Sequence, residues 1–165
     1  MNWWVVVVQW LHVLLGIIWF GNALVLATIL IPTLNPLPLT IQRQVGGAYG
    51  ERATRIFDVL VPTVILLGIV RGTVFGPIDG PDYLLGTAYG ITWLVALITS
   101  LLTHLWGRMV ITPAVRQMNA IALAPDGSPP AELVRVVGRV KRLVVLELIG
   151  FFVIFTCMIL MRFGY

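Results

Sequence analysis

Charged residues and cysteine are both scarce in this sequence. Asp, Glu, Lys and Arg make up 11% of its 165 residues, whereas a soluble domain averages about 25%. The single cysteine, Cys157, excludes an internal disulfide and a cysteine-rich metal site. The N-terminus lacks the basic residues and the small-residue cleavage site of a signal peptide, so we expect no cleavable leader. Hydrophobic residues make up 59% of the chain, which indicates an integral membrane protein.

The longest hydrophobic stretch, residues 3–31, contains no charged residue. It is longer than the ~20 apolar residues that cross a bilayer, and Pro32 is expected to end it. Three further apolar stretches cover about residues 56–75, 87–111 and 143–161. The sequence therefore predicts an all-α fold, a four-helix transmembrane bundle formed by a single domain, residues 1–165. The third helix is expected to continue past Pro113 toward Ala124.

Lys and Arg are concentrated in the first and third connections between these stretches, and the turn of the second connection has none. The positive-inside rule then places both termini on the outer, periplasmic or extracellular side of a cell (plasma or inner) membrane that the chain crosses several times. The 11 Lys and Arg against 7 Asp and Glu are explained by topology and lipid contacts, not by nucleic-acid binding. The lipid bilayer is the expected partner, and a homo-oligomer is left open.

A polar face with small residues runs along the first span. Gln9, His12, Gly16 and Trp19 follow one another at steps of three or four, which places them on one side of a helix. A lipid-facing surface would be uniformly aliphatic, so this face should contact protein. Ionisable groups inside a bilayer are functional candidates by default, and His12 is the first of them. A similar seam in the third span consists of Thr92, Ala96, Thr99, Thr103 and Gly107.

Three short motifs resemble a known family. They are Leu11-His12 with Trp19-Phe20 and Asn22, then Glu51-Arg52-x-x-Arg55-x-x-Asp58, then His104-x-x-Gly107-Arg108. Over roughly residues 5–115 the chain resembles the small bacterial membrane proteins related to HemJ-type protoporphyrinogen oxidase and to the copper-resistance D (CopD-like) domain. This resemblance implies a helical bundle, and it links the early histidine, here His12, with haem b.

The HemJ-type enzymes also need a lysine near the start of the third span. That position falls at about Trp93 here, and the membrane part of this chain has no lysine. Lys141 lies outside it and is no substitute. The resemblance therefore leaves haem or metal binding as its implication, while oxidation of protoporphyrinogen does not carry over and enzyme activity stays undetermined.

Several residues are expected at the same depth in the membrane as His12. They are Arg71, Trp93, Cys157, Met158 and Met161. Histidine with a cysteine or methionine sulfur suits haem b or, as the alternative, copper, and Arg71 would pair with a haem propionate. In the competing interpretation His12 is a neutral, hydrogen-bonded imidazole, the methionines fill gaps and Arg71 reaches toward Asp79 or Asp82.

A second group of polar residues is expected nearer the cytoplasmic surface: Asp58, His104, Arg108 and Glu147. His104 should lie ~12 Å or more from His12 along the bundle, which is too far for one haem between them. We expect Glu147 to be ionised and paired with Arg108 or Arg55, because a buried carboxylate needs a partner. The competing interpretation is a carboxylate–histidine group that relays protons or binds a metal.

Two hypotheses of function follow. The first is an integral membrane protein that binds haem or a metal and is redox-active, with haem b ligated by His12. The second is a cofactor-free structural or transport-type membrane protein of the same fold, in which both histidines only satisfy hydrogen bonds.

Overall fold

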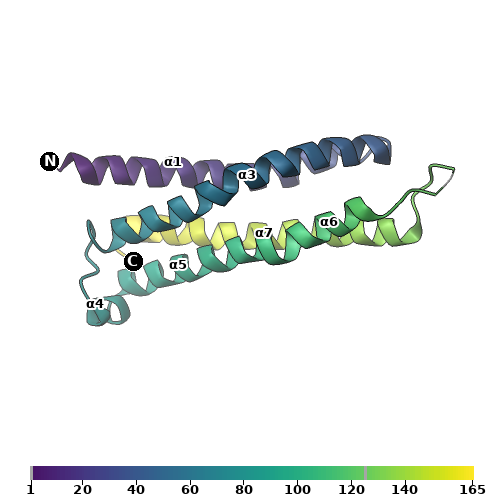
Figure 1. Ribbon diagram of the computed structural model, residues 1–165. Coiled ribbons are helices and arrows are strands. Elements are labelled where there is room, and N and C mark those ends of the chain that lie inside the picture. The colour runs from purple at the N-terminus through teal and green to yellow at the C-terminus, as the bar shows by residue number, and fades with distance from the viewer. Residues whose placement is uncertain (1, 125) are drawn as a thin grey trace.

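The computed structural model describes residues 2–124 and 126–165. Its helices form four long segments (Figure 1). The first joins α1 (Trp3–Val25), the π-helical turn η1 (Leu26–Leu30) and α2 (Ile31–Leu34), and the second is α3 (Leu39–Gly72). The third joins α5 (Ala88–Trp106), the π-helical turn η2 (Gly107–Ile111) and α6 (Thr112–Ala120), and the fourth is α7 (Ala131–Arg162). A short helix, α4 (Pro81–Gly86), lies in the second connection.

Each of the four segments is long and apolar enough to cross a membrane. The predicted all-α bundle with four spans is therefore confirmed, and the chain is a multi-pass membrane protein by fold. Large apolar side chains point outward all along it, including Trp3, Trp4, Trp10 and Phe163, which are 67%, 72%, 62% and 74% exposed. Such an apolar surface is stable in contact with lipid.

Two helices continue past a proline, and in each a wider, π-helical turn precedes that proline. A proline inside a regular helix removes one hydrogen bond, and its ring clashes with the carbonyl four residues earlier. In η1 the Leu26 carbonyl accepts from the N–H of Ile31, and Pro32 follows directly. In η2 the Gly107 carbonyl accepts from the N–H of Thr112, directly before Pro113. A π-turn at the same spacing before each proline lets the helix continue.

The expectation that Pro32 ends the first helix is therefore wrong, because the helix continues to Leu34. The second helix also begins earlier than its apolar part, at Leu39, so the polar stretch before residue 56 is helical. The extension of the third helix beyond Pro113 is confirmed, to Ala120.

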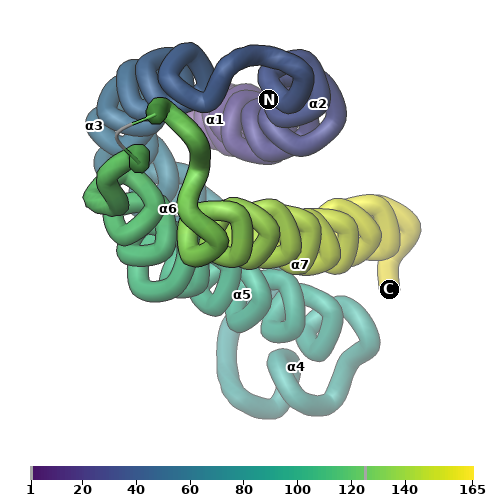
Figure 2. The backbone as a smooth tube through the Cα atoms, turned by 90° about the vertical axis from the view of Figure 1, so that its right-hand side faces the viewer, coloured from purple at the N-terminus to yellow at the C-terminus, as the bar shows by residue number. Residues whose placement is uncertain are grey.

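The four segments pack as two pairs. Viewed from one end, α1 and α3 lie together above α5, α6 and α7 (Figure 2). Close contacts between α5 and α7 depend on small residues, since a Cβ at Gly150 would collide with the side chain of Thr103. Of the small-residue seam predicted for the third span, Ala96 and Thr103 are buried, and Ser100 beside the seam is buried as well. An aromatic cluster joins α1 to α7, where Trp19 and Phe20 contact Phe151 at centroid distances of 4.9 and 5.5 Å.

The two ends of the bundle differ in charge. The two termini and α4 lie together at one end (Figure 1), which we call the terminal end. The opposite end carries the start of α3, α6 and the start of α7, and we call it the basic end. Nine of the eleven Lys and Arg residues belong to the basic-end half of the helices, the exceptions being Arg71 and Arg162.

Candidate functional site

His12 is seated against the middle of α3. Its Nδ1 lies 2.9 Å from the backbone carbonyl oxygen of Val64. Since a carbonyl only accepts, Nδ1 carries the proton and donates, which leaves the lone pair of the imidazole on Nε2. A Cβ atom at Gly68 would lie 2.9 Å from Cε1 of His12, so the absence of a side chain at Gly68 is what lets the ring come so close.

Trp93 of α5 reaches the same turn of α3. Its indole Nε1 donates to the Gly68 carbonyl over 3.4 Å, and a Cβ at Gly72 would overlap the indole ring. Two ring side chains from different helices thus rest on one glycine-containing stretch of α3, residues 68–72.

Arg71 is held at the edge of this arrangement. Its Nε donates to Oε1 of Gln9 and its Nη1 to the Phe75 carbonyl, both at 2.8 Å. Gln9 therefore serves Arg71 and not His12. Within the described ranges Arg71 forms no ion pair with Asp79 or Asp82. The structure brings together three of the predicted residues, and we call His12, Gly68, Arg71 and Trp93 the histidine site.

The sulfur residues expected beside His12 all lie on α7. Cys157 is buried, at 6% exposure, while Met158 is 36% exposed. Met161 is half-buried. No hydrogen bond between the described residues joins His12 to any of the three. Nor do three His, Cys, Asp or Glu side chains gather anywhere in residues 2–124 and 126–165 in a way that could hold a metal ion.

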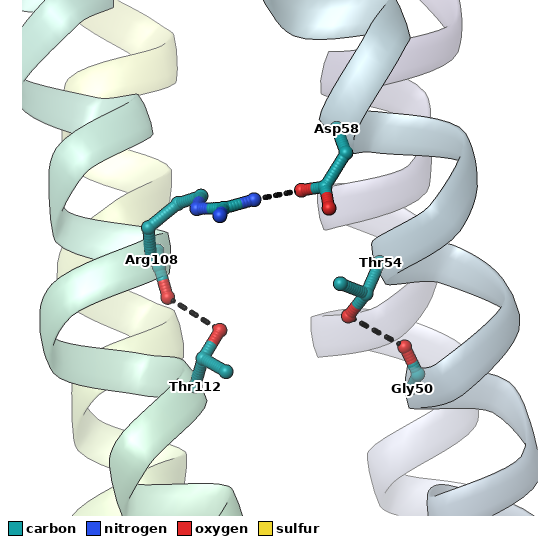
Figure 3. A network of polar contacts seen from close by, with 6 residues as sticks. Gly50, Thr54, Asp58, Arg108 and Thr112 are labelled. Carbon is teal, nitrogen blue, oxygen red and sulfur yellow. Dashed lines mark hydrogen bonds and ion pairs between the residues drawn. The ribbon is translucent and has the colours of Figure 1, made fainter.

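A cleft of about 800 Å³ lies between α1–α3 and α5–α7. All four members of the second predicted group, Asp58, His104, Arg108 and Glu147, line it. Arg108 of η2 reaches across to Asp58 of α3 and forms an ion pair with it (Figure 3). The structure thus gathers the predicted group around one cavity.

The expected ion pair of Glu147 with Arg108 or Arg55 is wrong. Among the described residues Arg108 pairs with Asp58, and Arg55 pairs with Glu51 on the surface of α3. The reason is the rotation of the third helix. Glu147 lies against Gly107, where a Cβ would be 3.0 Å from its Oε1. Arg108 is the next residue, about 100° further round the helix, so its side chain points to α3 and not to α7.

Two further contacts at the cleft were not predicted from the sequence. Tyr49 of α3 donates its hydroxyl proton to Oδ1 of Asn22 in α1, and Nη2 of Arg43 donates to the Met118 carbonyl over 3.1 Å. Asn22 belongs to the first of the three family-like sequence motifs, the one that contains His12. Its partner was missed because the stretch around Tyr49 was not expected to be helical. If the second helix had been predicted to begin at Leu39, the spacing of Arg43, Gly46, Gly50 and Ala53 would have placed them on one face of that helix.

No protein-family model, no curated protein and no solved structure matches this chain. The fold and the two sites therefore define its class, a four-span α-helical membrane protein with a histidine seated in its interior.

Proposed function

We propose that this protein binds haem b through Nε2 of His12. One observation carries the proposal: the Nδ1–H of His12 is engaged by the Val64 carbonyl at 2.9 Å. Histidines that ligate metals almost always donate their other ring N–H to a carbonyl or carboxylate, which fixes the tautomer and makes the free nitrogen more basic. His12 has this arrangement inside an apolar span.

Haem suits the donor set better than a copper ion bound by protein ligands alone. The porphyrin itself fills four coordination positions of the iron, so one histidine is enough to hold it. The described residues offer no cluster of three His, Cys, Asp or Glu for a bare ion. Arg71 uses only two of its five N–H donors in its bonds to Gln9 and Phe75, and the remaining donors suit a propionate.

Bound haem would supply one-electron chemistry, and the chain's part is to hold it. His12 provides the ligand and Arg71 a positive charge beside it. Trp93 of α5 packs on the same turn of α3 and provides an apolar wall. In the alternative, a cofactor-free structural or transport-type protein, the bond to Val64 only satisfies the imidazole. We also propose an orientation for the bundle: its basic end lies on the cytoplasmic side of a cell membrane, because Lys and Arg are retained on that side.

Absorption spectroscopy tests this proposal. We expect the full chain, purified in detergent and titrated with haemin, to develop a sharp Soret band with one equivalent bound. His12→Ala should lose the band, and the matched variant His104→Ala should keep it. Loss of the band in His104→Ala alone would place the ligand in the cleft instead. A wild type that binds no haem, and takes up no copper in the same assay, would leave the cofactor-free alternative.

A further inference from the structure

Most of the surface that lines the cleft between α1–α3 and α5–α7 is apolar, although the cleft is open to the surroundings. Its walls include Ala23, Leu26 and Leu30 from the first segment and Val140, Val144 and Phe151 from α7. A cavity of about 800 Å³ is within the range of cavities that hold drug-sized molecules. At membrane depth, water is a poor filling for apolar walls, so an apolar chain is the better one.

The cations of the cleft are not all neutralised by its acidic residues. Arg55 and Arg108 have their partners in Glu51 and Asp58. Three other cationic side chains line the cleft from three different helices: Arg43 of α3, Arg116 of α6 and Lys141 of α7. None of these three forms an ion pair with a described residue. They converge on one cavity and leave it with an uncompensated positive charge.

Arg43 adds a donor that lacks an acceptor. Its Nη2 bonds to the Met118 carbonyl, whereas its Nε is buried and has no hydrogen-bond partner in the described part of the chain. A buried donor without an acceptor destabilises the folded state. An oxygen-rich anion bound in the cleft would provide the missing acceptor.

Charge and apolar surface are arranged lengthwise. On α3, Arg43 lies about 27 Å from Val61, which is buried at the deep end of the cleft. On α7, Lys141 lies about 15 Å from Phe151 at that same deep end. Glu147 is about 9 Å deeper than Lys141, away from the three cations. The three cations without an ion-pair partner thus lie toward the basic end. Nearer the centre, apolar side chains share the cleft with the Asp58–Arg108 pair, His104 and Glu147. The excess positive charge is therefore at one end of the cleft, where an anionic headgroup would lie.

We infer that this cleft binds an anionic phospholipid, with the phosphate between Arg43, Arg116 and Lys141 and an acyl chain along the walls of α1 and α7. Basic pockets between transmembrane helices are suited to such headgroups. A zwitterionic lipid would leave the net positive charge uncompensated, and free phosphate would leave the apolar walls empty. The inference does not depend on His12, because His12 does not line the cleft.

Native mass spectrometry of the full chain in detergent tests this inference. With dioleoyl phosphatidylglycerol as the probe, we expect one tightly held lipid per chain, and at least tenfold weaker binding of dioleoyl phosphatidylcholine. Arg116→Gln/Lys141→Gln should weaken phosphatidylglycerol binding by roughly tenfold or more. Neither side chain donates to a described residue in the structure, so this variant should keep its fold, as a thermal melt will verify.

The matched control is Arg135→Gln/Arg139→Gln, which removes the same charge from the same end but from exposed positions outside the cleft. It should change lipid binding by less than about twofold. Equal losses in both double variants, or equal binding of both lipids, would overturn the inference. So would displacement of the lipid by millimolar inorganic phosphate, or a dimer that forms in place of the lipid adduct. His12→Ala should leave lipid binding unchanged, so the haem proposal and this one fail separately.

Discussion

Gly72 of α3 leaves the space that the indole of Trp93 occupies, because a Cβ atom at Gly72 would overlap Nε1 of that indole. The same indole bonds to the carbonyl of Gly68, against which His12 is seated. The packing of α5 on α3 and the position of the histidine are thus coupled through one short stretch of glycine-containing helix.

The first prediction concerns this packing. Gly72→Ala should lower the free energy of unfolding by about 1–3 kcal/mol, as overpacking of a filled interior does. Gly47→Ala is the control in the same helix. Its added Cβ meets nothing within 4 Å, and exchanging a mid-helix glycine for alanine stabilises a helix by roughly 0.5–1 kcal/mol. Unfolding titrations in SDS measure both. Gly72→Ala behaving like Gly47→Ala would show that Trp93 is not held against α3.

The second prediction concerns the ion pair across the cleft. Arg108 and Asp58 are about half exposed, at 52% and 44% of their side chains, so we expect a coupling free energy of only about 0.5–1 kcal/mol. Arg108→Gln and Asp58→Asn should therefore lose less in combination than the sum of the single losses. Arg108→Gln and Glu147→Gln form the comparison cycle, and their effects should add, because Glu147 lies against Gly107. Coupling in the second cycle and none in the first would restore the pairing expected from the sequence.

The number and kind of the helices were predictable, because crossing a bilayer requires long apolar stretches and this chain has four. The contact of the His12 face with protein was also predictable from its spacing, since helix geometry places His12 and Gly16 on one side. Both are half-buried and face Val64 of α3, whereas Gln9 on the same side is exposed. The continuation of the helix past Pro32 was not. Whether a proline ends a helix or is passed by a π-turn depends on the packing of the residues around it.

The partners of the charged residues could not be read from their depth. Asp58, Arg108 and Glu147 were expected together, and all three line one cleft. Which carboxylate meets Arg108 depends on the rotation of each helix about its axis, and one residue changes that direction by about 100°. Small residues set this rotation: Gly107 contacts Glu147 and Gly150 contacts Thr103. Hydrophobic periodicity does not resolve such angles.

The third prediction concerns orientation in the membrane. With Cys157→Ala as background, single cysteines at the exposed positions Asp82 and Ser128 would report on the two ends. We expect a membrane-impermeant maleimide to label the cysteine at position 82 in intact cells, and the one at position 128 only after the membrane is opened. The reason is that the basic end retains the positive charge, which translocates poorly. The reverse labelling pattern would put the basic end and its cleft outside.

The last prediction separates the structural role of His12 from its role as a ligand. Asparagine can donate from a position close to that of Nδ1, but it has no counterpart of the Nε2 lone pair. His12→Asn should therefore keep the bond to the Val64 carbonyl and unfold like the wild type. His12→Leu loses that donor and should unfold about 1 kcal/mol more easily, the usual contribution of one hydrogen bond. Both variants should lose the Soret band, because neither offers Nε2 to the iron. Haem binding by His12→Asn at wild-type affinity would mean that the ligand lies elsewhere, and His104→Asn would be the next variant to measure.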